Sequence, residues 1–259
     1  MTDNRAPLRI ALVQAASSLD PADNRAALAR LCPDGADLVV WPEAFARDFG
    51  SPGSDVGPYA EPVDGPFGQE LARVAGERRT TAIAGMFEAG ADPARPVNAL
   101  LVRGAAEAAY RKIHLYDSFG YRESDRLTAG PLDPVVVELA GWQVGLMTCY
   151  DLRFPELARA LVDRGAEVLV APAAWVAGPL KIDHWRTLLR ARAIENTVYV
   201  AAAGQPAPRY CGTSLVVDPM GRVLAEAGPE GETVVRAQAE TETLAEARRT
   251  NPSLANRRM

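Results

Sequence analysis

The chain is poor in lysine, histidine and cysteine, and each shortage narrows what the protein can be. Its 259 residues include two histidines and three cysteines, and only Lys112 and Lys181 among its 28 basic residues are lysine. Two histidines leave almost no candidates for a multi-histidine metal site. Cys32, Cys149 and Cys211 are odd in number and widely spaced, without a disulfide or zinc pattern. That usage favours a reducing, cytoplasmic location.

Excess positive charge and long apolar runs are also missing. The formal net charge is -5, which argues against a nucleic-acid partner or an anionic membrane surface. No apolar run approaches the roughly 20 residues needed to cross a bilayer. Met1–Pro7 is polar and leads directly into a strand-like segment, so no signal peptide is expected.

Strand and helix patterns are mixed along the whole chain, with no linker, low-complexity run or strong internal repeat. Helical spacing is predicted over 21–31, 67–79, 155–164 and 183–196. Asp183 is a candidate cap for the last of these helices. Strands are predicted over 8–14, 36–41, 81–87, 97–102, 108–113, 135–139, 143–147, 167–171, 197–203, 212–217, 222–226 and 233–237.

Many of these strands must be buried, and several are joined by short hairpins, so two sheets fit better than one. Hydrophobic residues make up 48% of the chain, enough for a sizeable core. We predict an α/β fold with one domain over residues 1–259, arranged as a four-layer α-β-β-α sandwich. Its core spans about 8–237, and the charged tail 238–259 is predicted to be extended or to contact a partner.

Three predicted strands end in residues suited to nucleophilic catalysis. Glu43 follows one strand, and Lys112 and Cys149 end two others. Ligand sites gather at the carboxyl ends of strands, so the three side chains are expected to converge. Cys149 would attack, Glu43 would accept its proton, and Lys112 with the Tyr150 backbone N–H would stabilise the developing negative charge. The plainer alternatives are a buried structural cysteine, a helix-capping glutamate and a lysine in a structural ion pair.

The surroundings of the cysteine refine this picture. Pro155-Glu156 suits the first turn of a helix, whose positive end would favour a thiolate at Cys149. His114 is interpreted as a structural hydrogen-bonding residue, and His184 could line the pocket or pack. Neither histidine is needed as a base if Glu43 serves.

A lysine kept in an arginine-dominated chain indicates that a compact, deprotonatable amine was needed at that position. This argument supports a special role for Lys112. Lys181 is equally consistent with ordinary surface.

At this point the sequence resembles the nitrilase superfamily of carbon-nitrogen hydrolases. Leu38–Glu43 is similar to the family's glutamate motif, Tyr110–Leu115 to its lysine motif and Gly145–Glu156 to its cysteine motif. The likeness extends from Leu8 to about Arg249. Further similar segments are Tyr121–Ser124 with Ala129-Gly130, Arg190–Asn196 and Gly212–Gly221.

The resemblance implies a role for each matching residue. Cys149 is the implied nucleophile, Glu43 the general base and Lys112 the cation at the tetrahedral intermediate. Glu123 is implied as a second carboxylate that orients Lys112 and assists proton transfer. The implied reaction hydrolyses a small linear amide through a thioester, with no metal or organic cofactor. The family fold is the α-β-β-α sandwich, paired into homodimers or higher homo-oligomers.

The residues after the cysteine, Tyr150–Glu156, resemble the Nit branch, which includes ω-amidases and deaminated-glutathione amidases. Those substrates pair an amide with a carboxylate. Arg153 is therefore a candidate carboxylate binder, with a structural ion pair as the alternative. Phe119, Tyr150 and Trp175 are candidate pocket walls.

Two features depart from that branch. Thr213 stands where the family often has histidine, and the loop 174–182 is apolar. Both leave room for a less polar amide. Hydrolysis of an N-carbamoyl compound or a nitrile is a same-class alternative. A binding or redox-sensing protein, in which Cys149 is only oxidisable, is the alternative from a different class.

Overall fold

Strand β1 (Leu8–Gln14) shows why the chain folds in layers. The side chains of Leu8, Ile10 and Leu12 lie in the core between two sheets. Ala11 and Val13, on the opposite face, belong to a second core beneath helices. Alternate residues of a strand point to opposite faces, so a strand that is apolar at nearly every position is covered on both sides.

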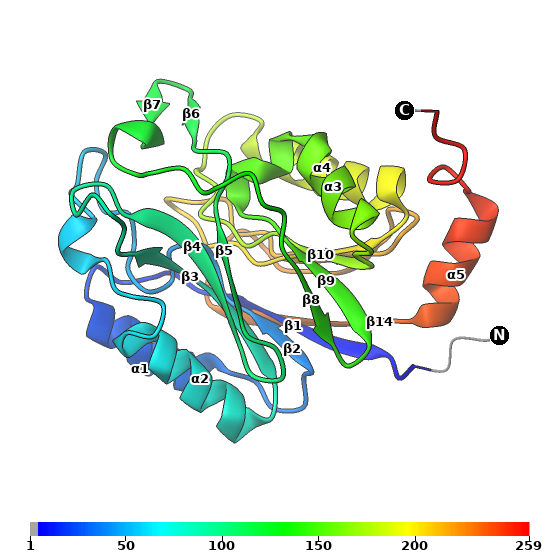
Figure 1. Ribbon diagram of the computed structural model, residues 1–259, viewed down its shortest axis with the longest axis horizontal. Helices are drawn as coiled ribbons and strands as arrows, with labels where there is room; N and C mark the ends of the chain where they lie inside the picture. The colour runs from blue at the N-terminus through cyan, green and yellow to red at the C-terminus, as the bar shows by residue number, and fades with distance from the viewer. Residues whose placement is uncertain (1–4, 259) are drawn as a thin grey trace.

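The computed structural model describes residues 5–258. Met1–Asn4 and Met259 lie outside the described residues, and with them most of the segment in which no signal peptide is expected. Figure 1 shows two sheets face to face, with α1 and α2 covering one and α3 and α4 covering the other. The predicted α-β-β-α sandwich is confirmed.

The first sheet has the strand order β14-β1-β2-β3-β4-β5. Its three central strands β1, β2 and β3 are parallel, and the others pair antiparallel. The strands besides β1 are β2 (Leu38–Val40), β3 (Thr81–Glu88), β4 (Val97–Arg103), β5 (Ala108–Arg111) and β14 (Thr233–Ala239).

The second sheet, β13-β12-β11-β10-β9-β8, repeats this arrangement with parallel β9, β10 and β11 at its centre. The two halves of the chain therefore share a topology although their sequences show no strong repeat. The strands of the second sheet are β8 (Val136–Leu139), β9 (Trp142–Leu146), β10 (Val168–Val170), β11 (Tyr199–Ala202), β12 (Leu215–Val217) and β13 (Val223–Glu226). A separate hairpin pairs β6 (Asp117–Ser118) with β7 (Tyr121–Arg122).

The covering helices are α1 (Pro21–Leu31), α2 (Pro66–Arg78), α3 (Pro155–Asp163) and α4 (Lys181–Asn196). Helix α1 begins as its sequence predicts, because the Asp20 carboxylate accepts a hydrogen bond from the Ala22 backbone N–H at 2.8 Å. The predicted cap of α4 is wrong. That helix begins two residues before Asp183, after Leu180 in a left-handed conformation (φ 61°). Within residues 5–258 no helix is long and apolar enough to cross a membrane.

The prediction of an extended tail is also wrong. Helix α5 (Thr241–Thr250) follows β14, and its Leu244 side chain joins the main core with 3% of its surface exposed. The Tyr199 hydroxyl bonds the backbone of Glu240 just before the helix. Farther on, Arg257 pairs with Asp163 of α3. The tail is therefore folded onto the body of the protein.

The docking of α5 predicts a stability effect. Leu244→Ala should lower the free energy of unfolding by about 2–4 kcal/mol, because it removes a buried side chain and leaves a cavity. Leu132, which is 87% exposed, supplies the matched control, and Leu132→Ala should change stability by less than about 0.5 kcal/mol. Urea denaturation followed by circular dichroism measures both. Equal effects of the two variants would contradict the docked tail.

Candidate active site

Glu43 lies three residues past the end of β2, and only 1% of its surface is exposed. Its carboxylate accepts hydrogen bonds from the Ala174 backbone N–H and the Asn98 amide, both at 2.8 Å. The chain at Glu43 passes directly over Gly85 of β3. A Cβ there would lie 2.7 Å from the Glu43 Cα and 2.4 Å from the next backbone nitrogen. A glycine in β3 is therefore what allows Glu43 to enter the site.

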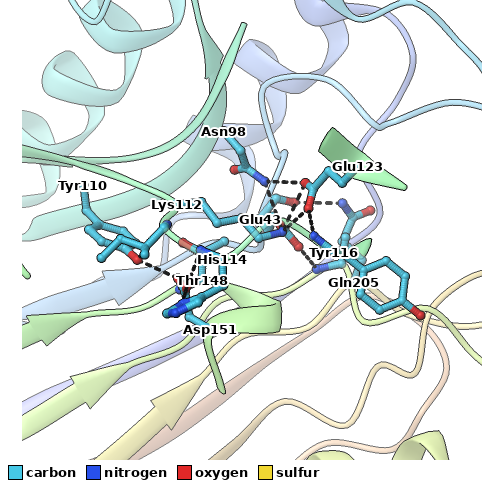
Figure 2. A network of polar contacts seen from close by, with 12 residues as sticks. Glu43, Asn98, Tyr110, Lys112, His114, Tyr116, Glu123, Thr148, Asp151 and Gln205 are labelled. Carbon is cyan, nitrogen blue, oxygen red and sulfur yellow. Dashed lines mark hydrogen bonds and ion pairs between the residues drawn. The ribbon is translucent and has the colours of Figure 1, made fainter. Parts of the chain in front are cut away.

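Lys112 directly follows β5, and only 1% of its surface is exposed. Its backbone N–H donates to the Asn98 carbonyl at 2.8 Å, which continues the β4–β5 pairing by one residue. The Nζ atom lies 2.9 Å from Glu43 Oε1 and 2.9 Å from Glu123 Oε2. Figure 2 shows the ammonium between the two carboxylates.

Cys149 opens a short 3-10 helix, Cys149–Arg153, just past β9. Its φ of 48° is left-handed, a strained conformation for a residue with a side chain. The backbone N–H of Cys149 donates to the Pro172 carbonyl at 3.0 Å and anchors this turn beside the end of β10. The thiol lies close enough to the Glu43 carboxylate for each group to shift the pKa of the other. The structure thus brings together the three predicted catalytic residues.

The charges of the site depend on one another. Burial raises the pKa of the Cys149 thiol well above its ordinary value, and the Glu43 carboxylate raises it further. Burial opposes the charge on Lys112, but Glu123 and Glu43 outweigh it and raise the pKa of the ammonium. Burial also works against ionised Glu43, yet Lys112 and the Ala174 N–H hold the pKa of that carboxyl below its usual range. The resting site therefore holds an ammonium, a carboxylate at Glu43 and a protonated thiol.

The expectation of a thiolate favoured by a helix end is wrong. Helix α3 begins at Pro155, six residues after Cys149, whereas the field of a helix terminus falls off within its first turn. Desolvation and the adjacent carboxylate dominate instead. A buried thiol of raised pKa needs a nearby base to react as a nucleophile, and Glu43 is the carboxylate that most affects its pKa.

Glu123 holds Lys112 from the opposite side to Glu43. It lies in a short 3-10 helix, Glu123–Asp125, with 2% of its residue exposed. Besides Lys112, its carboxylate accepts the Tyr116 backbone N–H at 2.6 Å. Glu123 therefore fixes both the ammonium and the loop that crosses over it.

Two residues in this network were not predicted from the sequence. The Asn98 side chain donates to Glu43 at 2.8 Å and to Glu123 at 3.4 Å, so one amide bridges both carboxylates. Asp151, with no exposed surface, accepts the Tyr110 hydroxyl at 2.7 Å and the Thr148 backbone N–H at 2.9 Å. Neither residue has a spacing signature. A polar residue inside an apolar strand was the available signal for Asn98.

Asp151 also explains His114. The His114 backbone N–H and Nδ1 lie 3.0 and 2.8 Å from Asp151 Oδ1, and its ring stacks on Phe154 with centroids 3.8 Å apart. His114 is thus a structural hydrogen-bonding residue. Asp151 ties the turn that carries Cys149 to the segment that carries Lys112, as Figure 2 shows.

The predicted pocket residues also lie close together. The Arg153 guanidinium carbon is 4.9 Å from the centroid of the Trp175 ring, 5.7 Å from Phe119 and 6.0 Å from Tyr150. No carboxylate within residues 5–258 forms an ion pair with Arg153, so the structural ion-pair alternative has no support. Its Nη2 lies 3.4 Å from His184 Nδ1, which places His184 at this site.

Thr213, the residue that departs from the branch pattern, is buried away from solvent. Its hydroxyl donates to the Cys211 carbonyl at 2.9 Å, and its own carbonyl accepts the Trp185 indole N–H at 2.9 Å. Thr213 therefore forms structural hydrogen bonds within the core, through its hydroxyl and its carbonyl. Within the described part of the chain, no group of three or more histidine, cysteine, aspartate or glutamate residues is placed to hold a metal ion.

Comparison with known proteins gives consistent matches. The family model described as carbon-nitrogen hydrolase matches residues 9–249. Deaminated glutathione amidase of Escherichia coli O157:H7 is 43% identical over 203 residues, which cover 77% of each chain. Omega-amidase NIT2 of Mus musculus is 35% identical over 244 residues, covering 86% of this chain and 85% of the mouse protein.

A solved structure adds a chemical observation about a similar protein. It is a glutamate-to-glutamine mutant of the amidase from Nesterenkonia sp. AN1, showing Michael addition of acrylamide at the active site cysteine. The two chains are 29% identical with a TM-score of 0.77, and the match covers 94% of this chain and 99% of the other.

The role of Asp151 predicts a graded loss of stability. Asp151→Asn should lower the free energy of unfolding by at least about 2 kcal/mol, because an amide cannot accept every hydrogen bond that the carboxylate accepts. Tyr110→Phe removes one of those donors and should cost about 1 kcal/mol. Chemical denaturation of both variants checks the order. An Asp151→Asn protein as stable as the wild type would rule out this anchoring role.

Proposed function

The chain belongs to the carbon-nitrogen hydrolase family, and from that premise we propose that Cys149, Glu43 and Lys112 carry out its reaction. The family and its amidase-named relatives make the protein a cysteine-dependent amidohydrolase acting on carbon-nitrogen bonds. The observation that carries the assignment of residues is the buried Glu43–Lys112 ion pair at 2.9 Å, with the buried Cys149 thiol close enough for Glu43 to raise its pKa.

In the first half of the proposed reaction, Glu43 takes the thiol proton as the Cys149 sulfur attacks the amide carbonyl carbon. The carbonyl π electrons move to its oxygen. Lys112 donates to Glu43 and to both oxygens of Glu123, and its longer bond to Glu123, at 3.1 Å, would give way to a bond with this oxyanion. The intermediate then collapses, the carbon-nitrogen bond breaks, and Glu43 returns the proton to the departing ammonia or amine.

In the second half, water adds to the thioester. Glu43 accepts a proton from the attacking water, the carbon-sulfur bond breaks, and the proton goes to the leaving Cys149 sulfur. A carboxylic acid is released and the resting thiol is restored. Glu123 keeps Lys112 oriented throughout, because its other oxygen keeps the shorter bond to the ammonium, at 2.9 Å.

We propose a small linear amide that carries a carboxylate at its other end as the substrate. The names of the bacterial and mouse relatives, deaminated glutathione amidase and omega-amidase, support this class. So does Arg153, a half-buried cation without an ion-pair partner among residues 5–258. Phe119, Tyr150 and Trp175 would form the apolar walls around the linking carbons.

A homodimer or higher homo-oligomer and a cytoplasmic location complete the proposal. The first rests on the family resemblance. The second is supported by Cys32, Cys149 and Cys211, all of which are free thiols.

The catalytic assignment predicts a covalent intermediate. Cys149→Ala should lower amide turnover by at least about 10³-fold, and Glu43→Gln by about 10²–10⁴-fold through loss of the base. Cys32→Ala, which removes a different buried thiol, should leave turnover near that of the wild type. Intact-mass spectrometry of Glu43→Gln with substrate should show an acyl adduct. Full turnover by Cys149→Ala would exclude the mechanism.

The substrate class is tested by ammonia release from succinamate, butanamide, N-carbamoyl-β-alanine and butyronitrile. Succinamate is expected to be hydrolysed with the highest kcat/KM. Ammonia from the nitrile or the carbamoyl compound, with none from either amide, would establish one of the alternative activities.

The lowered pKa of Glu43 predicts where activity falls in acid. Its carboxyl has a pKa below the ordinary 4.5 in the folded protein. The base therefore stays ionised as the pH falls through 4.5 and is protonated only below it. The kcat/KM for butanamide, a substrate without a titrating group, should keep more than half of its neutral value down to pH 4.5. Loss of half the activity above pH 4.5, with an unchanged circular dichroism spectrum, would contradict this charge state.

A further inference from the structure

The second lysine of the chain, Lys181, lies in the same aromatic cluster as Arg153. It is the first residue of α4, with 7% of its residue exposed. Its Nζ atom lies 4.1 Å from the centroid of the Phe119 ring, 5.1 Å from Tyr116 and 5.6 Å from Trp175. The expectation of an ordinary surface lysine therefore does not hold.

The conformation of the apolar loop 174–182 positions the Lys181 amine. The Trp175 indole N–H donates to the Lys181 carbonyl at 3.0 Å and fixes the backbone at the start of α4. The loop reaches the helix through Leu180, whose φ is 61°. A loop that looked suited to a neutral substrate thus places a cation against the aromatic rings of this cluster.

Lys181 and Arg153 share two aromatic neighbours, Phe119 and Trp175. The positive charge of Arg153 acts together with burial to lower the pKa of the Lys181 ammonium. Two cations at one apolar site repel each other, and desolvation adds to the cost. An anion bound between them would relieve both effects.

The described chain supplies no such anion. No carboxylate within residues 5–258 forms an ion pair with Lys181 or with Arg153. The Lys181 ammonium donates to the Tyr116 hydroxyl at 3.1 Å, which leaves further N–H donors for another group. The Arg153 Nε is buried without a hydrogen-bond partner.

Aromatic rings also connect the two cations to the segment that carries Cys149. Tyr116 packs edge-on against Tyr150, the neighbour of Cys149, with ring centroids 5.0 Å apart. Its backbone N–H is held by Glu123 at 2.6 Å. Cys149 itself is near enough to influence the pKa of Lys181. An anion on the two cations would therefore belong to a molecule that also reaches the nucleophile.

We propose that Lys181 and Arg153 form a two-cation subsite for the distal carboxylate of the substrate, and that Lys181 sets the preference for anionic over neutral amides. One carboxylate oxygen bonds the ammonium and the other bonds the guanidinium. A compact ammonium suits this position because it can keep its bond to Tyr116 while donating to the substrate. The inference rests on the proposed amidase function and specifies its substrate end.

The test compares kcat/KM for succinamate with kcat/KM for butanamide, which has the same carbon chain without the carboxylate. Lys181→Met should lower the ratio of these two values by about tenfold or more, since it removes a hydrogen-bonded charge contact. The loss should lie mainly in KM for succinamate. Arg186→Met removes one positive charge from an exposed site on the same helix, where Arg186 pairs with Glu226, and should leave the ratio unchanged.

A second variant keeps the test decisive if Lys181→Met folds poorly. Tyr116→Phe removes only the hydroxyl that holds the ammonium and should lower the same ratio by a smaller factor. Unfolding curves establish that each variant is native.

The outcomes separate the two proposals. Wild-type enzyme that hydrolyses neither amide would overturn the proposed function itself. Wild-type enzyme without a preference for succinamate, or a Lys181→Met variant with an unchanged ratio, would overturn only the two-cation subsite. Equal losses on both substrates would assign Lys181 a structural role and would overturn the subsite as well.

Discussion

The site depends on one buried ammonium held between two carboxylates. Burying Lys112, Glu43 and Glu123 is costly for each charge taken alone, and their mutual attraction offsets the cost only when all three are present. The group carries one excess negative charge, which the Asn98 amide partly balances by donating to both carboxylates. Removing one partner of such a group typically costs about 3–5 kcal/mol. The three charged residues that hold the geometry of the site therefore also determine its local stability.

That arrangement also determines the protonation state of Cys149. Lys112 lowers the pKa of the Cys149 thiol, but burial and the negative charge of Glu43 both raise it and outweigh the lysine. The thiol is kept protonated beside Glu43, so in the proposed mechanism the thiolate forms only when a carbonyl is in place to take the negative charge. Lys112 then has an oxyanion to stabilise in addition to its two carboxylates. In the proposed reaction, Glu43 passes the thiol proton to the departing amine in the first half and a proton from water back to the sulfur in the second.

The sequence predicts the layers well because they follow from periodicity, as in Leu8–Gln14, where both faces are buried. It fails where a few contacts decide the outcome. Leu244 docks a charged tail that has little apolar pattern. Asn98 and Asp151 act through hydrogen bonds between segments far apart in the chain, which no local spacing encodes. The convergence of Glu43, Lys112 and Cys149 was predictable because ligand sites gather at the carboxyl ends of strands. The charge state of Cys149 was not, since desolvation depends on the packed environment.

The two lysines show how surroundings give one residue type opposite roles. Lys112 is saturated by carboxylates of its own chain, and its charge is available only to a transient oxyanion. Lys181 is nearly as buried but has aromatic rings and a phenol around it, with Arg153 close by. Aromatic faces attract a cation but do not neutralise it. An anion from outside the described chain would offset the repulsion between these two partly desolvated cations, and in our proposal the distal carboxylate of an acidic amide is that anion.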